Sequence, residues 1–234
     1  MSTTRTTKPS APESVNCVTT TRASRRHHLG MLGLLVLCGL LSACAGSYVL
    51  RSGFQPHAAP NSPLATVAPL RVAFLSPTDL RIGLAEIGRF DPNNLEMFVP
   101  FKTEKPEEQE VQADLSKLLA AVGIAIDPAA PVKLRLALRH YQASGRRSFD
   151  STTFSTAIAF DLNVYGSVSD ESLYLGSYRG RADARGTDGG AQDTYFNTAL
   201  TLAIDRAMRE VAADPGLAEA LLQAAAETRL DPLL

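Results

Sequence analysis

The sequence predicts an α+β domain with two layers, in which a mainly antiparallel four-stranded sheet carries two amphipathic helices on one face. Two observations lead to this class. Three consecutive stretches in the second half of the chain alternate between apolar and polar residues, as strands with one buried face do. Two other stretches repeat apolar residues at helical spacing, and such helices can cover the buried face of a sheet.

One strand and one helix are predicted before the alternating stretches. The strand covers 70–75, which is rich in strand-forming residues and is bounded by Pro69 and Pro77. The helix covers 107–122, because a proline and two acids suit its first turn. Its apolar residues form one stripe: Val111, Leu115, Leu118, Leu119 and Val122.

The alternating stretches predict strands over 132–141, 154–164 and 173–180. Turns are expected at 144–147 and 169–172, so the three strands form an antiparallel meander. The last long helix is predicted to end at 214–216, and a short terminal helix follows it. The residues that share a face of the long helix are Phe196, Leu200, Ala203, Ile204, Ala207, Met208 and Val211.

An export signal is predicted near the start of the chain. A basic cluster at 22–26 precedes an apolar run at 29–41, which is too short to cross a bilayer and is typical of a secretory signal. The run ends in Leu41-Ser42-Ala43-Cys44, which resembles the bacterial lipoprotein signal, or lipobox. The resemblance implies cleavage between Ala43 and Cys44 and acylation of Cys44, with chains such as palmitate.

The lipobox resemblance also implies a location. Several acyl chains anchor a protein stably in a membrane. Ala45 follows the cysteine, where an Asp in enteric lipoproteins favours retention at the inner membrane. We therefore expect a lipid-anchored protein on the periplasmic face of the outer membrane. A twin-arginine signal at 24–29 is an alternative export route, although the usual Phe and trailing Lys of that signal are missing.

The chain divides into four predicted parts. Residues 1–43 are a leader and signal peptide, and 44–69 are the lipidated cysteine with a tether rich in proline. A single domain follows at 70–228, with a C-terminal tail at 229–234. A flexible tether of this length spans about 28 Å, which would leave the domain free to meet a partner away from its anchor.

Composition excludes several classes of function. The chain has 23 Lys and Arg and 24 Asp and Glu; five of these bases and one acid precede Cys44, so the mature part carries 18 bases, 23 acids and a net charge of −5. This argues against nucleic-acid binding and against electrostatic attraction to anionic lipid. Cys17 and Cys38 are lost with the signal and Cys44 is acylated, which leaves no disulfide. We expect no cofactor and no metal.

Catalytic residues are scarce in the mature chain. His57 lies in the predicted tether, so a Ser-His-Asp arrangement would have to use His140, which we expect on the apolar face at the end of its strand. A hydrolase that acts on peptidoglycan is an alternative and would need paired carboxylates such as those of Asp161, Asp183 or Asp188. A small-ligand carrier, with an apolar cavity between sheet and helices, is a further alternative.

A contact surface is predicted on the solvated face of the sheet. Arginine and tyrosine are enriched at protein interfaces, and both occur on neighbouring predicted strands. The candidate partner-binding residues are Arg135, Arg139, Tyr174, Tyr178, Arg179 and Arg181.

The run from Phe154 to Val211, together with the lipobox, resembles small outer-membrane lipoproteins of the YajG type. It contains a long alternating strand, the sequence Tyr174-Leu175-Gly176-Ser177-Tyr178-Arg179-Gly180, and Asn197-x-Ala199-Leu200 in the helix. The resemblance implies a non-catalytic envelope accessory role, and assembly lipoproteins of the LptE type share the general plan. We therefore predict a lipid-anchored accessory protein that binds or helps to assemble a protein or peptidoglycan partner in the periplasm.

Overall fold

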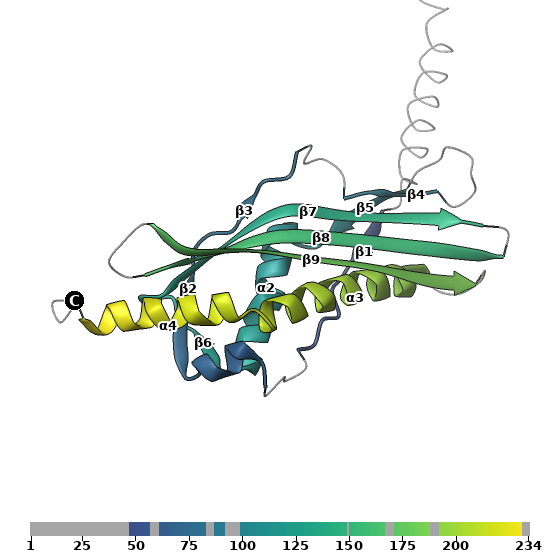
Figure 1. Ribbon diagram of the computed structural model, residues 1–234. Coiled ribbons are helices and arrows are strands. Elements are labelled where there is room, and N and C mark those ends of the chain that lie inside the picture. Colours follow the sequence, from purple (N-terminus) through teal and green to yellow (C-terminus); the bar gives the residue numbers. More distant parts are fainter. Residues whose placement is uncertain are drawn as a thin grey trace, which may run out of the picture. The chain divides into compact units, whose positions relative to one another are not determined.

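In the residues that the structure describes, the protein is an α+β domain with three α-helices and a large mixed sheet (Figure 1). The computed structural model describes residues 47–56, 61–82, 87–91, 99–148, 150–166, 171–187 and 192–230. The helices are α2 (Glu107–Ala121), α3 (Gln192–Ala212) and α4 (Pro215–Leu230), and a 3₁₀ helix, η2, covers Pro63–Val67. The predicted α+β class is therefore confirmed.

Three long antiparallel strands form the centre of the sheet. They are β7 (Lys133–Arg147), β8 (Ser151–Tyr165) and β9 (Ser172–Thr187), and β8 pairs with β7 on one side and with β9 on the other. The predicted turn at 144–147 is wrong, because these residues continue β7 and pair with the start of β8. Gly145 is needed there for close packing, since a Cβ at this position would lie 2.4 Å from the ring of Phe90.

Short strands fill the other edge of β7. In succession along its length, β2 (Leu70–Phe74), β3 (Thr78–Asp79) and β4 (Arg89–Asp91) all pair with it in parallel. Strand β6 (Ile124–Ile126) extends the sheet beyond β2, while β5 (Val99–Thr103) and β1 (Tyr48–Leu50) extend it beyond β4. The predicted four-stranded, mainly antiparallel sheet is therefore wrong in its details.

The helices lie on one side of the three long strands (Figure 1). Helix α3 contacts β8 and β9, α2 contacts β6 and β7, and α4 contacts the ends of β8 and β9. The two predicted amphipathic helices are confirmed, and the terminal helix, expected to be short, has 16 residues. The core between the layers consists of apolar side chains that are fully buried, such as Leu134, Leu136, Phe160, Leu200 and Ile204.

The described residues before β2, 47–56 and 61–69, are packed into the domain, where a tether was predicted. Leu50, Phe54, Leu64 and Val67 are all buried. The backbone N–H of Arg51 donates to Oδ1 of Asn197 at 2.9 Å, and that of Gly53 donates to Oγ1 of Thr201 at 2.9 Å, so the segment runs along α3. Prolines and small residues made this stretch resemble a linker, while its few large apolar residues pack in the core.

A cluster of aromatic rings connects the N-terminal strands to the main sheet. The ring centroid of Phe196 on α3 lies 4.0 Å from that of Phe154 on β8 and 4.4 Å from that of Phe101 on β5. Phe90 and Tyr48 pack against the same Phe196 ring. Such edge-to-face contacts add to the stabilisation from burial, so β1, β4 and β5 are held to the sheet and to α3 together.

Within the described ranges, no helix has the length and apolar character required to span a membrane. The lipobox, Cys44 and the leader all lie outside the described residues.

Candidate functional site

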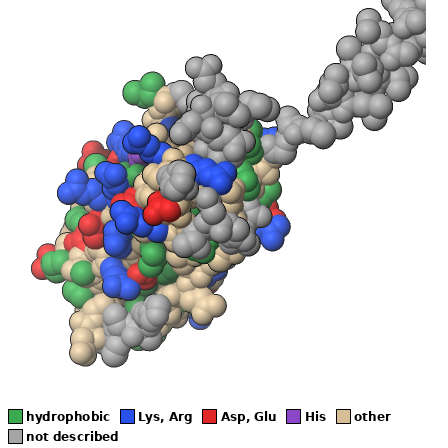
Figure 2. All heavy atoms as spheres, turned by 90° about the vertical axis from the view of Figure 1, so that its right-hand side faces the viewer, with side chains coloured by type: hydrophobic (Ala, Val, Ile, Leu, Met, Phe, Trp, Pro, Cys, Tyr) green, Lys and Arg blue, Asp and Glu red, His purple; other side chains and the backbone are tan. Residues whose placement is uncertain are grey.

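The face of β7, β8 and β9 that points away from the helices is strongly basic, and we call it the open face. Alternation and strand register place on it seven Lys and Arg but only two acids. Its bases are exposed, and Figure 2 shows Lys and Arg side chains gathered with a histidine among them. The charged residues are Lys133, Arg135, Arg139, Arg146, Arg179, Arg181 and Arg185, with Asp161 and Asp183.

The open face differs in charge from the rest of the chain. Residues 44–234 have a net charge of −5, so without the seven bases and two acids of the open face this part of the sequence has a net charge of −10. Positive and negative charges are thus segregated by the fold. A basic surface on an acidic protein attracts anions locally, whatever the sign of the total charge.

Arg139 differs from the other bases of the open face because its charge is neutralised. Its Nε donates to Oδ2 of Asp161 at 2.6 Å, and the hydroxyl of Ser177 donates to Oδ1 of the same carboxylate at 2.7 Å. Asp161 is 6% exposed, so the pair joins β7, β8 and β9 structurally. Arg135 lies with its guanidinium carbon 5.3 Å from the ring centroid of Tyr165, a cation–π contact.

A groove with a volume of about 590 Å³ lies where the open face meets the edge of the sheet. Its floor is formed by Ala157 and Ala159 of β8, whose neighbours on β9 are Arg181 and Arg179. His140 stands on the other side of Ala159, on β7. Small side chains between long ones produce the depression. We call this site, defined by these five residues, the arginine groove.

Helix α3 closes the arginine groove on its outer side. The guanidinium of Arg206 donates to the backbone carbonyl of Arg181, and the carboxylate of Glu210 accepts the backbone N–H of Arg179 at 3.0 Å. These contacts satisfy polar groups of β9, which is an edge strand, and so protect the edge. They also occupy Glu210, while Arg179 and Arg181 form no ion pair with any described residue.

Tyr174 and Tyr178 do not belong to the open face, so that part of the predicted contact surface is wrong. Tyr178 is only 4% exposed, and its hydroxyl donates to Oδ2 of Asp214 at 2.6 Å. The hydroxyl of Tyr174 donates to the same oxygen at 2.5 Å. Burial raises the pKa of both hydroxyls, and the Asp214 carboxylate raises it further. The four predicted arginines do share the open face.

His140 also lies on the opposite face from the one expected. A register shift between Leu138 and His140 inserts Arg139 as an extra residue and reverses the alternation of β7. His140 is therefore exposed on the open face. Within the described part of the chain its imidazole has no hydrogen-bond partner among serines or aspartates, so the structure does not assemble a Ser-His-Asp arrangement on it.

The carboxylates named for a hydrolase are not brought together. Asp161 pairs with Ser177, and Asp183 pairs with Ser155. The two rows are six residues apart along β8, which is about 20 Å and far more than the roughly 5–10 Å between the two acids of a glycosidase. Asp188 lies outside the described residues.

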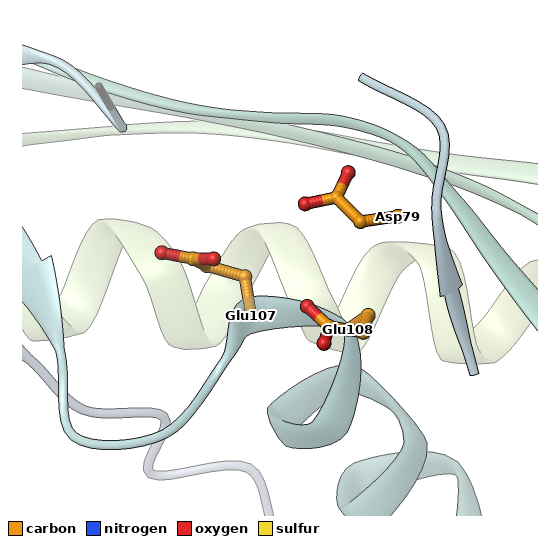
Figure 3. A group of neighbouring side chains, drawn as sticks. All are labelled: Asp79, Glu107 and Glu108. Atoms are coloured by element: carbon orange, nitrogen blue, oxygen red, sulfur yellow. The ribbon is translucent and has the colours of Figure 1, made fainter. Parts of the chain in front are cut away.

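A separate group of carboxylates lies between β3 and α2. Oxygens of Asp79, Glu107 and Glu108 are within 4.8 Å of one another, and Figure 3 shows Asp79 reaching from its strand toward the first turn of the helix. Nη2 of Arg81 lies 2.5 Å from Oδ2 of Asp79 and 2.9 Å from Oε2 of Glu107. The hydrogen bonds from Arg81 lower the pKa of Asp79. Because this guanidinium is already paired with two of the three acids, a metal ion would have to compete with it for their oxygens.

An apolar cavity of about 540 Å³ lies elsewhere in the molecule. It is lined by Phe54 of the N-terminal segment, Leu118 of α2 and Met208 of α3, with Asp205 and Arg209 among its polar residues. The carrier hypothesis placed a cavity between sheet and helices, but this one lies between helices and the N-terminal segment.

Sequence patterns missed several bases near the site. Arg146 falls in the predicted turn at 144–147 and Arg185 lies beyond the predicted strand at 173–180, but both lie on strands of the open face. Arg206 of α3 was missed because only the final packing brings it to the edge of β9. Continued alternation beyond Gly145 was the signal that would have identified Arg146.

Comparison with known proteins gives structural matches alone. No family model matches the chain, and no curated protein matches it. A solved structure from Xanthomonas campestris, of the DUF330 family, is 11% identical, covers 79% of this chain and 99% of its own, and has a TM-score of 0.49. Lipoprotein GNA1162 from Neisseria meningitidis is 12% identical, with coverage of 70% and 99% and a TM-score of 0.29.

A hypothetical protein from Chlamydia trachomatis is a third structural match. It is 13% identical, covers 67% of this chain and 98% of its own, and has a TM-score of 0.40. None of these three scores reaches 0.5, so the matches transfer neither a site nor a function to this chain.

Proposed function

We propose that this protein is a lipid-anchored accessory protein of the cell envelope, without catalytic activity, that binds an envelope partner through the open face. Cys44 carries the anchor, and the domain stands on the periplasmic side of the outer membrane. The observation that carries the proposal is the open face itself, a broad basic sheet surface that the helices leave uncovered.

The distribution of polar residues supports binding rather than catalysis. Arg179 and Arg181 are exposed and without an ion pair in the described region, so they are available to a partner. The candidate catalytic groups, His140, Asp161 and Asp183, are held apart or engaged in structural contacts. Arginine on a rigid sheet is well suited to recognition, because its guanidinium loses little freedom for each hydrogen bond formed.

The anchor is tested by the intact mass of the membrane-extracted protein. We expect a product that begins at Cys44 and carries acyl groups, and we expect Cys44→Ala to abolish both the cleavage and the added mass, because the thiolate is the group that is acylated. An unmodified soluble product would contradict the anchoring.

The binding surface is tested in the same cells by placing a photo-crosslinking residue at Gln142, which is exposed on the open face, or at Leu222, which is 49% exposed on α4. Adducts with a protein, lipid or peptidoglycan are expected from position 142 in larger amounts than from position 222. Equal yields from both positions, or no adduct at all, would refute the role of the open face.

A further inference from the structure

We propose that the partner of the open face is the membrane itself, and that the arginine groove binds the phosphate groups of anionic lipid headgroups. This inference rests on the proposed function, since the anchor at Cys44 brings the domain to a lipid surface. It specifies that the sheet lies with its open face toward the bilayer, instead of pointing away from it toward the periplasm.

The length of chain between the anchor and the domain supports this arrangement. Because β1 begins at Tyr48, only three residues separate Cys44 from the first strand. Even when fully extended, this connection spans about 14 Å. A domain held so closely to a membrane presents one of its surfaces to the lipid headgroups.

Charge complementarity selects the surface. The open face combines seven bases with two acids, while the remaining mature chain has a net charge of −10. An anionic lipid surface attracts nearby Lys and Arg and repels an acidic surface. The total charge of −5, which argued against lipid binding, does not describe the field at this face.

The arginine groove provides a place for a phosphate group. Arg179 and Arg181 are two residues apart on the same side of β9, with their Cα atoms about 7 Å from each other. The alanine floor allows a headgroup to approach the sheet, and planar guanidinium groups match phosphate oxygens with paired hydrogen bonds. Glu210, the acid that lines the groove, is already engaged by the backbone of β9.

The test uses the acylated mature protein reconstituted in nanodiscs of phosphatidylcholine, with or without phosphatidylglycerol. The other two cysteines, Cys17 and Cys38, precede the cleavage site, and Cys44 is blocked by acylation, so Ser155→Cys provides a single reactive thiol on the open face. A fluorophore on this thiol reports contact through quenching by a headgroup-spin-labelled lipid. The same fluorophore on Leu222→Cys of α4 is the positional control.

We expect strong quenching at position 155 when phosphatidylglycerol is present, and weak quenching at position 222. The double substitution Arg179→Gln, Arg181→Gln should reduce quenching at position 155 to the level in phosphatidylcholine alone. Arg51→Gln, Arg71→Gln removes the same charge from exposed positions outside the open face and should change nothing. Arg135→Gln, Arg146→Gln, on the open face but outside the groove, should have a smaller effect.

Each of the following outcomes would overturn the inference. Equal quenching at positions 155 and 222 would mean that the open face is not oriented toward the membrane. Equal losses of quenching at position 155 from all three double variants would mean that binding depends on net charge alone and not on a specific site. Equally strong quenching at position 155 in phosphatidylcholine alone would mean that the groove does not bind the anionic headgroup. A protein adduct at position 142 with no quenching at 155 would refute the lipid inference and leave the proposed function standing, whereas an unacylated Cys44 would remove both.

Discussion

Asp214 joins the buried side of the sheet to the last helix. Its Oδ2 accepts the hydroxyls of Tyr174 and Tyr178, while its Oδ1 accepts the backbone N–H of Gly216 at 2.8 Å. It thus caps the N-terminus of α4 and at the same time accepts a hydrogen bond from the buried hydroxyl of Tyr178. Burial raises the pKa of Asp214, but the hydrogen bonds from the two hydroxyls and from the backbone outweigh this and lower it overall.

Replacing this carboxylate is therefore expected to be costly. Asp214→Ala removes the helix cap and leaves the buried hydroxyl of Tyr178 without an acceptor, for a loss of about 2–4 kcal/mol in the free energy of unfolding. Urea titration measures the free energy of unfolding. Asp214→Asn is the control, because it keeps one acceptor oxygen and should therefore lose less stability. A change of less than about 0.5 kcal/mol in the alanine variant would contradict the assigned role.

Glu110 on α2 is an acid in an unfavourable environment. Burial raises its pKa to about 7, and the nearby carboxylates of Asp114 and Glu107 act in the same direction, against backbone hydrogen bonds from Lys105 and Glu104. Among the described residues, neither its buried Oε2 nor the buried hydroxyl of Tyr141 has a hydrogen-bond partner. Burial raises the pKa of Tyr141, and the charge of Glu110 raises it further.

The stability of the protein should consequently depend on pH through Glu110. The folded-state pKa of about 7 exceeds the unfolded value of 4.5, so the stabilisation is fully present below pH 4.5 and is lost as the pH rises through about 7. Glu110→Gln should remove this loss and make the protein more stable than the wild type at about pH 8, by about 1 kcal/mol after allowance for solvent screening.

Urea unfolding from about pH 5 to about pH 8 measures the effect, because proton linkage appears as a slope in the unfolding free energy. Glu219→Gln, at an exposed position of α4, is the matched control, since it removes a carboxylate without removing a buried charge. Parallel pH profiles for the wild type and Glu110→Gln would refute the prediction.

Helix α3 and strand β9 approach each other so closely at Gly180 that no side chain fits between them. A Cβ at Gly180 would lie 1.8 Å from the carbonyl oxygen of Ala203 and 3.0 Å from the backbone N of Ala207. Both atoms belong to the backbone of α3, which cannot give way as a side chain can. The same approach brings Arg206 and Glu210 to the edge of β9.

Gly180→Ala should therefore push the helix away from the strand and destabilise the protein by about 3 kcal/mol, at the upper end of the usual cost of overpacking. Thermal unfolding followed by circular dichroism measures the loss. Gly53→Ala is the control, because its Cβ would meet only the side chain of Thr201 at 3.3 Å, which can adjust. Equal stability of the two variants would show that α3 moves freely.

The glycines of β9 also explain why the tyrosines were placed on the wrong face. Gly176, Tyr178, Gly180 and Ala182 form the buried side of this strand, and Leu175 is 58% exposed on the other. Hydrophobicity therefore does not identify the buried side of β9. The close approach of α3 requires small residues at positions where large apolar side chains are expected. In β7, the extra residue Arg139 shifts the alternation, so His140 and the residues after it lie on the opposite side of the sheet from the one expected.

In the molecule as a whole, the N-terminal segment belongs to the folded domain and limits the length of the predicted tether. Leu50, Phe54, Leu64 and Val67 are committed to the core, and three residues of the sequence separate β1 from Cys44, the proposed position of the anchor. The open face combines bases from β7 and β9, strands that are separated in sequence by the whole of β8. Both features bear on the proposed contact with a membrane, and neither is local in the sequence.

The sequence by itself determined the α+β class, the three long strands and the amphipathic helices, because these depend on the burial of neighbours at spacings of two to four residues. It also identified Arg135, Arg139, Arg179 and Arg181 as residues of one face. Only the tertiary structure decided the parallel pairing of β2, β3 and β4 with β7, the side on which His140 stands, and the separation of charge between surfaces. These depend on contacts between distant segments, whose free energy no local pattern records.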